Sequence, residues 1–142
     1  MTHTHALDIV GGEPTLGFVI RTGQDLIAAV RHGLPVAAVD HVIATGRMTL
    51  AEVDEVVLPR KTLSHRKKIG RLTADQSDRL MRAARVIAAA EDTFGSREKA
   101  ATWLRRPTTA LAGVAPLSLL DTSEGALQVE TLLGRIDHGI AA

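Results

Sequence analysis

Residues 49–70 decide how this chain folds, and they read Thr-Leu-Ala-Glu-Val-Asp-Glu-Val-Val-Leu-Pro-Arg-Lys-Thr-Leu-Ser-His-Arg-Lys-Lys-Ile-Gly. Thr49 is followed three residues later by Glu52, which is the capping-box pattern that starts a helix. Pro59 ends this helix and permits a second one, which begins at Arg60 and is stopped by Gly70. The stretch therefore predicts two short helices, 49–57 and 60–69, joined by a tight turn. This is the outline of a helix-turn-helix.

The second of these helices is strongly basic. Residues 60–71 contain six lysines and arginines and no acid, although the whole chain has a net charge of only +1. The second helix of a helix-turn-helix enters the DNA major groove, where cations neutralise phosphates and donors reach base edges. We expect Leu63 to face inward. The candidate DNA-binding residues are Arg60, Lys61, Ser64, His65, Lys68 and Arg71. The alternative interpretation is a basic face that is only solvated.

The helical pattern continues on both sides of this stretch. Further helices are expected over residues 25–32, 35–46, 73–94, 96–106 and 122–138, and no segment has the pattern of a strand, so the predicted fold class is all-α. Residues 1–22 are weakly patterned and are expected to form a flexible N-terminal arm. Residues 23–72 are expected to form the helix-turn-helix domain. Residues 73–142 then form a long connecting helix and a small second helical domain.

The composition excludes several classes of protein. With 45% hydrophobic residues among 142, the chain is expected to fold, and with 2% aromatics it lacks a base-stacking platform. It has no cysteine, no secretion signal and no apolar run of about 20 residues, so we expect a cytoplasmic protein without a membrane span. Nothing resembles a nucleophile with its base, or a nucleotide-binding loop after a strand. We therefore expect no enzymatic activity, no cofactor and no metal site.

The order of the motifs resembles one known family. The stretch from Leu58 to Thr73, followed by Ser77-Asp-Arg-Leu80, is similar to the helix-turn-helix of the Xre/MbcA/ParS antitoxins. Four later motifs resemble that family's C-terminal toxin-binding domain: Ala90-Glu-Asp-Thr-Phe-Gly95, Ala101-Thr-Trp-Leu104, Pro116-Leu-Ser-Leu-Leu120 and Gly134-Arg-Ile-Asp-His-Gly139. The resemblance runs from about residue 24 to the end of the sequence.

The resemblance implies a binding protein rather than an enzyme. The partner would be a RES-domain toxin, which consumes NAD either by degrading it or by ADP-ribosylating a protein. The C-terminal region of the antitoxin would cover the NAD site of the toxin. The helix-turn-helix would bind operator DNA and repress the antitoxin's own operon, as a homodimer within a toxin–antitoxin complex.

The end of the chain supplies the candidate toxin-binding residues. The last helix has an apolar face from Val129 to Ile136, which suits packing. The candidate toxin-binding residues are Arg135, His138, Gly139, Ile140, Ala141 and Ala142. We hypothesise that the carboxylate of Ala142, or backbone carbonyls near it, occupies polar space in the NAD pocket. The alternative is that residues 139–142 are only a frayed helix end.

Two other functions stay open at this stage. The chain could be a helix-turn-helix transcriptional regulator whose C-terminal half only dimerises, because the basic helix fits that function equally well. Copurification with an adjacently encoded enzyme would distinguish the two. A small enzyme is disfavoured, because no catalytic set of residues can be assembled.

Overall fold

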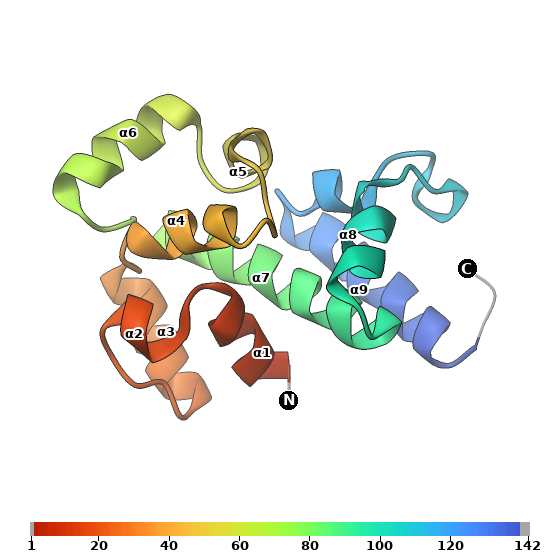
Figure 1. Ribbon diagram of the computed structural model, residues 1–142, viewed down its shortest axis with the longest axis horizontal. Helices are drawn as coiled ribbons and strands as arrows, with labels where there is room; N and C mark the ends of the chain where they lie inside the picture. Colours follow the sequence, from red (N-terminus) through yellow and green to blue (C-terminus); the bar gives the residue numbers. More distant parts are fainter. Residues whose placement is uncertain (1, 140–142) are drawn as a thin grey trace.

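The computed structural model describes residues 2–139, with side chains from residue 5 onward. Figure 1 shows the arrangement of the helices. In chain order they are α1 (Thr2–Ile9), α2 (Gly12–Leu16), α3 (Gly23–His32), α4 (Ala37–Ala44), α5 (Leu50–Val56), α6 (Arg60–Ile69), α7 (Ala74–Phe94), α8 (Arg97–Arg105), the 3₁₀ helices η1 (Thr109–Leu111) and η2 (Pro116–Leu119), and α9 (Ser123–Asp137). Between residues 2 and 139 the structure has no strand, and the β-type pairing there consists of two isolated bridges. The prediction of an all-α fold is confirmed.

Helix α7 is the centre of the fold. It has 21 residues, which corresponds to a length of about 30 Å, and it runs through the middle of the molecule (Figure 1). Helices α1, α3, α5, α8 and α9 all pack against it. Ala83, Ala88 and Ala90 are fully buried along α7. Because alanine side chains are short, the neighbouring helices can approach α7 closely on several sides.

The helices begin and end where the local signals predict. The hydroxyl of Thr49 accepts the backbone N–H of Glu52 at 3.1 Å, and the hydroxyl of Thr73 accepts that of Gln76 at 3.1 Å. Both capping boxes are complete. Gly70 ends α6 with φ of 92°, a left-handed conformation that glycine adopts without the penalty of a Cβ atom. The predicted bounds of the two helices of the helix-turn-helix are therefore confirmed.

The N-terminal segment differs from the expectation. We expected residues 1–22 to be a flexible arm, but residues 2–16 form α1 and α2, and α1 packs along α7. Ile9 and Val10 are fully buried, and Ala6 and Leu16 nearly so. A helix of eight residues is not stable by itself, so local sequence patterns gave no sign of it. Packing against α7 supplies the missing stabilisation.

Candidate functional site

The turn between α5 and α6 is fixed from both sides. Leu58 is 2% exposed and anchors the turn in the core. Asp54 of α5 accepts the backbone N–H of Arg60 through Oδ1 at 2.7 Å, which satisfies one of the free amides at the start of α6. Asp54 could not be recognised from the sequence, because it lies six residues before Arg60, outside the usual spacing of a helix cap. The bond holds α6 at a defined angle to α5.

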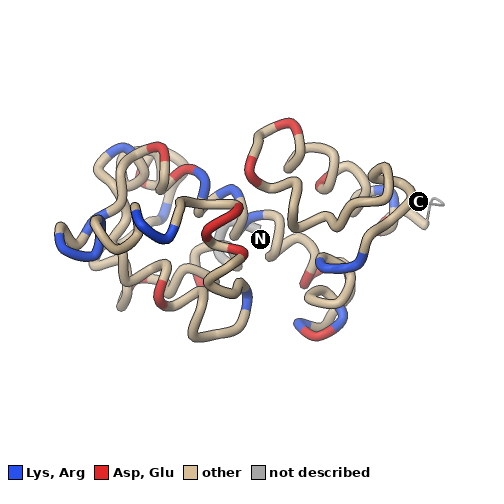
Figure 2. The backbone as a smooth tube through the Cα atoms, turned by 90° about the horizontal axis from the view of Figure 1, so that it is seen from above, with Lys and Arg blue, Asp and Glu red and all other residues tan. Residues whose placement is uncertain are grey.

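Helix α6 presents its predicted residues to solvent. Leu63 is 3% exposed and faces the core, as predicted. The six candidate DNA-binding residues are all exposed: Arg60, Lys61, Ser64, His65, Lys68 and Arg71. Figure 2 shows Lys and Arg positions at the left-hand end of the molecule, where α6 lies. The structure therefore brings these side chains together on one accessible surface, which we call the α6 surface.

The charge of the α6 surface is largely uncompensated. Within residues 5–139, the one cation of α6 with a carboxylate inside 4.0 Å is Lys67, whose Nζ lies 3.7 Å from Asp40 Oδ1. Both side chains are more than half exposed, so this pair neutralises little charge. A surface with several cations and few counter-charges suits a polyanion such as DNA.

Two further residues, Arg66 and His32, contact Arg71 at the C-terminal end of the α6 surface. Arg66 is half-buried and its Nε donates to the carbonyl of Arg71 at 2.9 Å. Arg71 Nη1 donates to His32 Nε2 at 3.1 Å, and both side chains are exposed. The place of His32 at this surface could not be recognised from the sequence, because His32 and Arg71 are 39 positions apart. The bridge between Pro35 and Arg71 brings them together.

The C-terminal candidate residues lie at the end of α9. Thr122 caps this helix by accepting the backbone N–H of Gly125 at 3.0 Å. Arg135, His138 and Gly139 are exposed. The ring of His138 turns back onto the helix, where Nδ1 donates to the carbonyl of Gly134 at 2.7 Å. The other predicted toxin-binding residues, Ile140, Ala141 and Ala142, lie outside the described residues.

A groove of about 260 Å³ runs beside α9 and includes one of these residues. Its lining includes Leu111, Leu132 and Arg135. Leu127, which also lines the groove, is 57% exposed. A single exposed leucine is common on protein surfaces, so the groove is a candidate binding surface because of its place beside Arg135 rather than because of Leu127.

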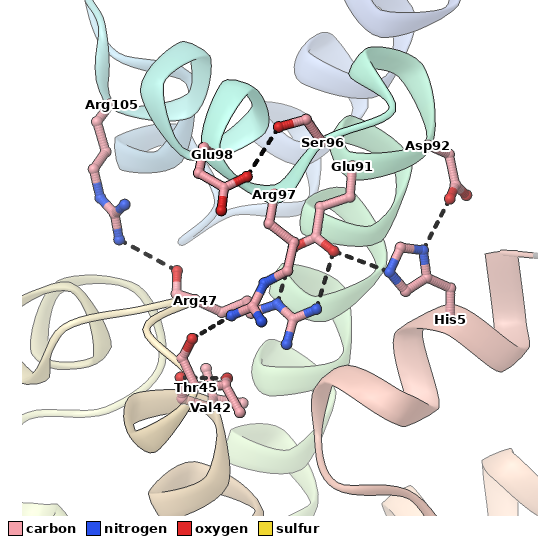
Figure 3. A network of polar contacts seen from close by, with 10 residues as sticks. All are labelled: His5, Val42, Thr45, Arg47, Glu91, Asp92, Ser96, Arg97, Glu98 and Arg105. Atoms are coloured by element: carbon pink, nitrogen blue, oxygen red, sulfur yellow. Dashed lines mark hydrogen bonds and ion pairs between the residues drawn. The ribbon is translucent and has the colours of Figure 1, made fainter.

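A polar network joins the two halves of the chain (Figure 3). Arg47, between α4 and α5, donates to both carboxylate oxygens of Glu91 on α7, at 2.9 and 3.1 Å. His5 of α1 lies between Glu91 and Asp92, with its ring nitrogens 3.0 and 2.9 Å from their oxygens. Arg97 of α8 donates to the carbonyl of Thr45. The network thus connects α1, the α4–α5 turn, α7 and α8.

Two glutamates at this junction have shifted pKa values. Burial by itself would raise the pKa of Glu91, but the hydrogen bonds and charges of Arg47 and His5 outweigh burial and hold the pKa below its ordinary value. Burial also acts to raise the pKa of Glu52, whereas hydrogen bonds from Arg105 and from Thr49 lower it by more. Both glutamates are therefore ionised at neutral pH, which keeps these contacts intact.

A buried arginine holds the second domain together. Arg82 is 9% exposed in the middle of α7. Its guanidinium donates to the carbonyls of Leu120 and Asp121, at 3.3 and 2.9 Å, and to the hydroxyl of Ser123 at 3.3 Å. These contacts fix the connection between η2 and α9. Helix α7 contains two other arginines, Arg79 and Arg85, so its sequence does not distinguish Arg82 from them.

Metal-binding and membrane-spanning features are absent from the described part of the chain. Among the residues whose side chains are placed, no group of three or more His, Cys, Asp or Glu could hold a metal ion. No helix found between residues 2 and 139 is both long and apolar enough to cross a bilayer.

The geometry defines a class of protein: a helix-turn-helix domain joined through a shared long helix to a second helical domain. Residues 25–85 match the family model of the antitoxin Xre-like helix-turn-helix domain. Residues 89–139 match the model of the antitoxin Xre/MbcA/ParS C-terminal toxin-binding domain. The chain belongs to the Xre/MbcA/ParS antitoxin family, and the resemblance seen in its motifs is confirmed.

Individual relatives agree with this assignment. The chain is 39% identical to an antitoxin Xre of Photorhabdus laumondii over 131 residues, which covers 90% of this chain and 88% of the relative. It is 34% identical to an antitoxin Xre of Yersinia enterocolitica over 128 residues, which covers 88% and 86%. It is also 31% identical to a Prs ADP-ribosylating antitoxin of a Sphingobium species over 134 residues, which covers 83% and 81%.

Proposed function

We propose that this chain inhibits a RES-domain toxin that consumes NAD, and that it represses its own operon by binding operator DNA through α6. The observation that carries the proposal is the joining, in one chain, of the exposed α6 surface to a domain of the toxin-binding family. The name of the Sphingobium relative refers to ADP-ribosylation, a reaction that uses NAD. The antitoxin itself acts by shape and charge rather than by catalysis.

Toxin binding is assigned to the end of α9 and the groove beside it. Arg135 lines that groove, and Leu127 exposes apolar surface in it. Gly139 has φ of 70°, a left-handed conformation that does not continue the helix. Residues 139–142 then enter the NAD cleft of the toxin, while Arg135 and His138 contact its rim.

DNA binding is assigned to the six exposed residues of the α6 surface. A single basic patch on a chain of net charge +1 gives weak binding, so the repressor acts as a dimer. A dimer presents two such helices about 34–36 Å apart on one face of the DNA, which matches one helical turn.

The DNA assignment is tested with a triple variant, Arg60→Gln, Lys61→Gln and Lys68→Gln. Binding to a DNA fragment from upstream of the gene is measured over a range of salt concentrations. We expect weaker binding and a salt slope lower by about one for each phosphate contact removed. The control is Lys99→Gln, an exposed lysine on α8. If the triple variant binds as tightly as the control, α6 is not the DNA-binding helix.

The toxin assignment is tested with the RES-domain enzyme encoded beside this gene. NAD consumption is measured with the wild type, with a chain lacking residues 139–142, and with Arg135→Glu. We expect both changes to weaken inhibition, whereas the exposed Arg31→Glu on α3 leaves it unchanged. Full inhibition by the shortened chain and by Arg135→Glu would contradict this assignment. A chain that binds DNA and dimerises but inhibits no such enzyme is the regulator of the alternative hypothesis.

A further inference from the structure

The toxin-binding domain directly contacts the start of the helix-turn-helix. Arg105 is the last residue of α8, and Glu52 lies in the first turn of α5. Arg105 Nε and Nη2 donate to the two carboxylate oxygens of Glu52, each at 2.8 Å. This two-point geometry is the strongest that an arginine and a carboxylate form, and it fixes orientation as well as distance.

Glu52 is at the same time the residue that caps α5. Its Oε1 accepts the backbone N–H of Thr49 at 2.8 Å, in addition to Arg105 Nη2. Only 19% of the Glu52 side chain is exposed. Arg105 Nη2 also reaches the carbonyl of Arg47 at 3.4 Å, and Figure 3 shows it directed at the α4–α5 turn. The cap of α5 is thereby locked to the end of α8.

A second arginine of α8 holds the same turn. Arg97 donates to the carbonyl of Thr45, which lies shortly before the cap in the sequence. In addition, η2 packs on α5, where Val56 and Leu117 line a shared cleft with Arg105. Helix α8 therefore holds both ends of the 45–52 segment, and η2 packs against one side of α5.

The position of α5 is passed on to α6. The Asp54 carboxylate of α5 binds the first amide of α6, the N–H of Arg60, at 2.7 Å. The turn between them is short and its Leu58 is buried. A shift of α5 therefore shifts the helix that carries the candidate DNA-binding residues.

We infer that Arg105 is a positioning residue for DNA binding: it sets the placement of α5 through Glu52, and α5 sets the placement of α6. The inference rests on the proposed DNA binding by α6. It assigns to a residue of the toxin-binding domain a role in the affinity for DNA, although that residue touches no DNA itself.

The first test compares Arg105→Gln with Arg106→Gln, an exposed neighbour, as the control. DNA binding is measured at a temperature where both variants are fully folded. We expect Arg105→Gln to weaken binding by roughly 2- to 30-fold, the usual range of coupling through a structure. Its salt slope stays equal to that of the wild type, because no phosphate contact is lost. Arg105→Lys restores only part of the affinity, since lysine cannot make the two-point contact.

Two results of that test would overturn the inference. Binding unchanged within the error of the control would show that the contact is merely structural. A salt slope lower by about one would show that Arg105 contacts phosphate directly.

The second test uses Glu52→Gln, which removes the charge but keeps the cap, because glutamine also completes a capping box. If Arg105 acts through Glu52, the double variant with Arg105→Gln and Glu52→Gln binds DNA about as strongly as the weaker of the two single variants. Additive losses would overturn the assignment to this pair.

Hydrogen exchange separates this inference from the proposed function. We expect amides of residues 50–69 to exchange faster in Arg105→Gln than in Arg106→Gln. If the wild type binds no DNA at all, the proposed function fails, and the exchange result still decides whether Arg105 positions α5 and α6. Equal exchange rates in Arg105→Gln and Arg106→Gln would refute the inference that Arg105 positions α5 and α6.

Discussion

The carboxylate of Glu91 and the guanidinium of Arg47 form a two-point ion pair, with Arg47 Nε 2.9 Å from one oxygen and Nη2 3.1 Å from the other. Only 8% of the Glu91 side chain and 15% of the Arg47 side chain are exposed. The pair joins α7 to the turn that leads into the helix-turn-helix. It therefore connects the two halves of the chain at a point where water screens the charges poorly.

Replacing Glu91 by glutamine should destabilise the protein, because it leaves the charge of Arg47 without its partner. We expect a loss of about 1.5–3 kcal/mol in the free energy of unfolding, measured by urea denaturation. Asp92→Asn is the matched control, since Asp92 is 56% exposed and contacts only His5 within the network. That change should cost at most about 1 kcal/mol. Equal losses in the two variants would show that the Arg47 contact adds nothing.

Stability should fall as the solution is acidified. The pKa of Glu91 is held below its ordinary value, because the contacts of Arg47 and His5 outweigh burial. A carboxyl whose pKa is lower in the folded state stabilises that state above the unfolded pKa, which is about 4.3 for glutamate. This contribution is lost as the pH falls through the folded pKa. The free energy of unfolding, measured by urea denaturation between pH 7 and pH 3, should decline below about pH 5.

The same titration on Glu91→Gln should show a shallower decline in the free energy of unfolding, since one of the carboxyls with a lowered pKa is gone. Glu52, whose pKa is also lowered, keeps part of the dependence. A decline of identical steepness in the variant would contradict the assignment to Glu91.

Helix α1 should be part of the cooperative fold. Ile9 is fully buried, and Ile9→Ala is expected to cost about 2–5 kcal/mol in the free energy of unfolding. The same substitution at Ile27, which is 49% exposed on α3, should cost no more than about 0.5 kcal/mol. Thermal unfolding of both variants compares them directly. An unchanged midpoint for Ile9→Ala would mean that α1 does not contribute to stability.

The start of α9 should not tolerate a side chain at residue 125. A Cβ atom on Gly125 would lie 1.9 Å from the carbonyl oxygen of Leu119, and backbone cannot move aside cheaply. We expect Gly125→Ala to cost about 1–3 kcal/mol. At Gly134 in the same helix, an added Cβ atom would meet nothing within 4 Å, so Gly134→Ala should stabilise the protein by about 0.5–1 kcal/mol. Effects of the same sign on the melting temperature would show that helix propensity, rather than contact with η2, decides both sites.

Local signals determine a large part of this fold. The capping boxes at Thr49 and Thr73 and the glycine stop at Gly70 predicted the helix-turn-helix at its observed boundaries. A cap depends on hydrogen bonds between residues three or four apart, so the local sequence carries all the information needed. The exposure of the α6 surface follows in the same way, because the helical period and one apolar anchor, Leu63, place the charges outward.

The contacts between distant parts of the chain could not be predicted from those signals. His32 and Arg71 are 39 residues apart, and Glu52 and Arg105 are 53 apart. A sequence shows that a side chain is charged, but the packing of helices around α7 decides which charge it meets. The docking of α1 has the same cause, because an eight-residue helix exists only when another surface buries it. The sequence alone therefore determined helices α3 to α9 and the basic surface, whereas the tertiary structure decided how α1 docks and how the C-terminal domain contacts the helix-turn-helix domain.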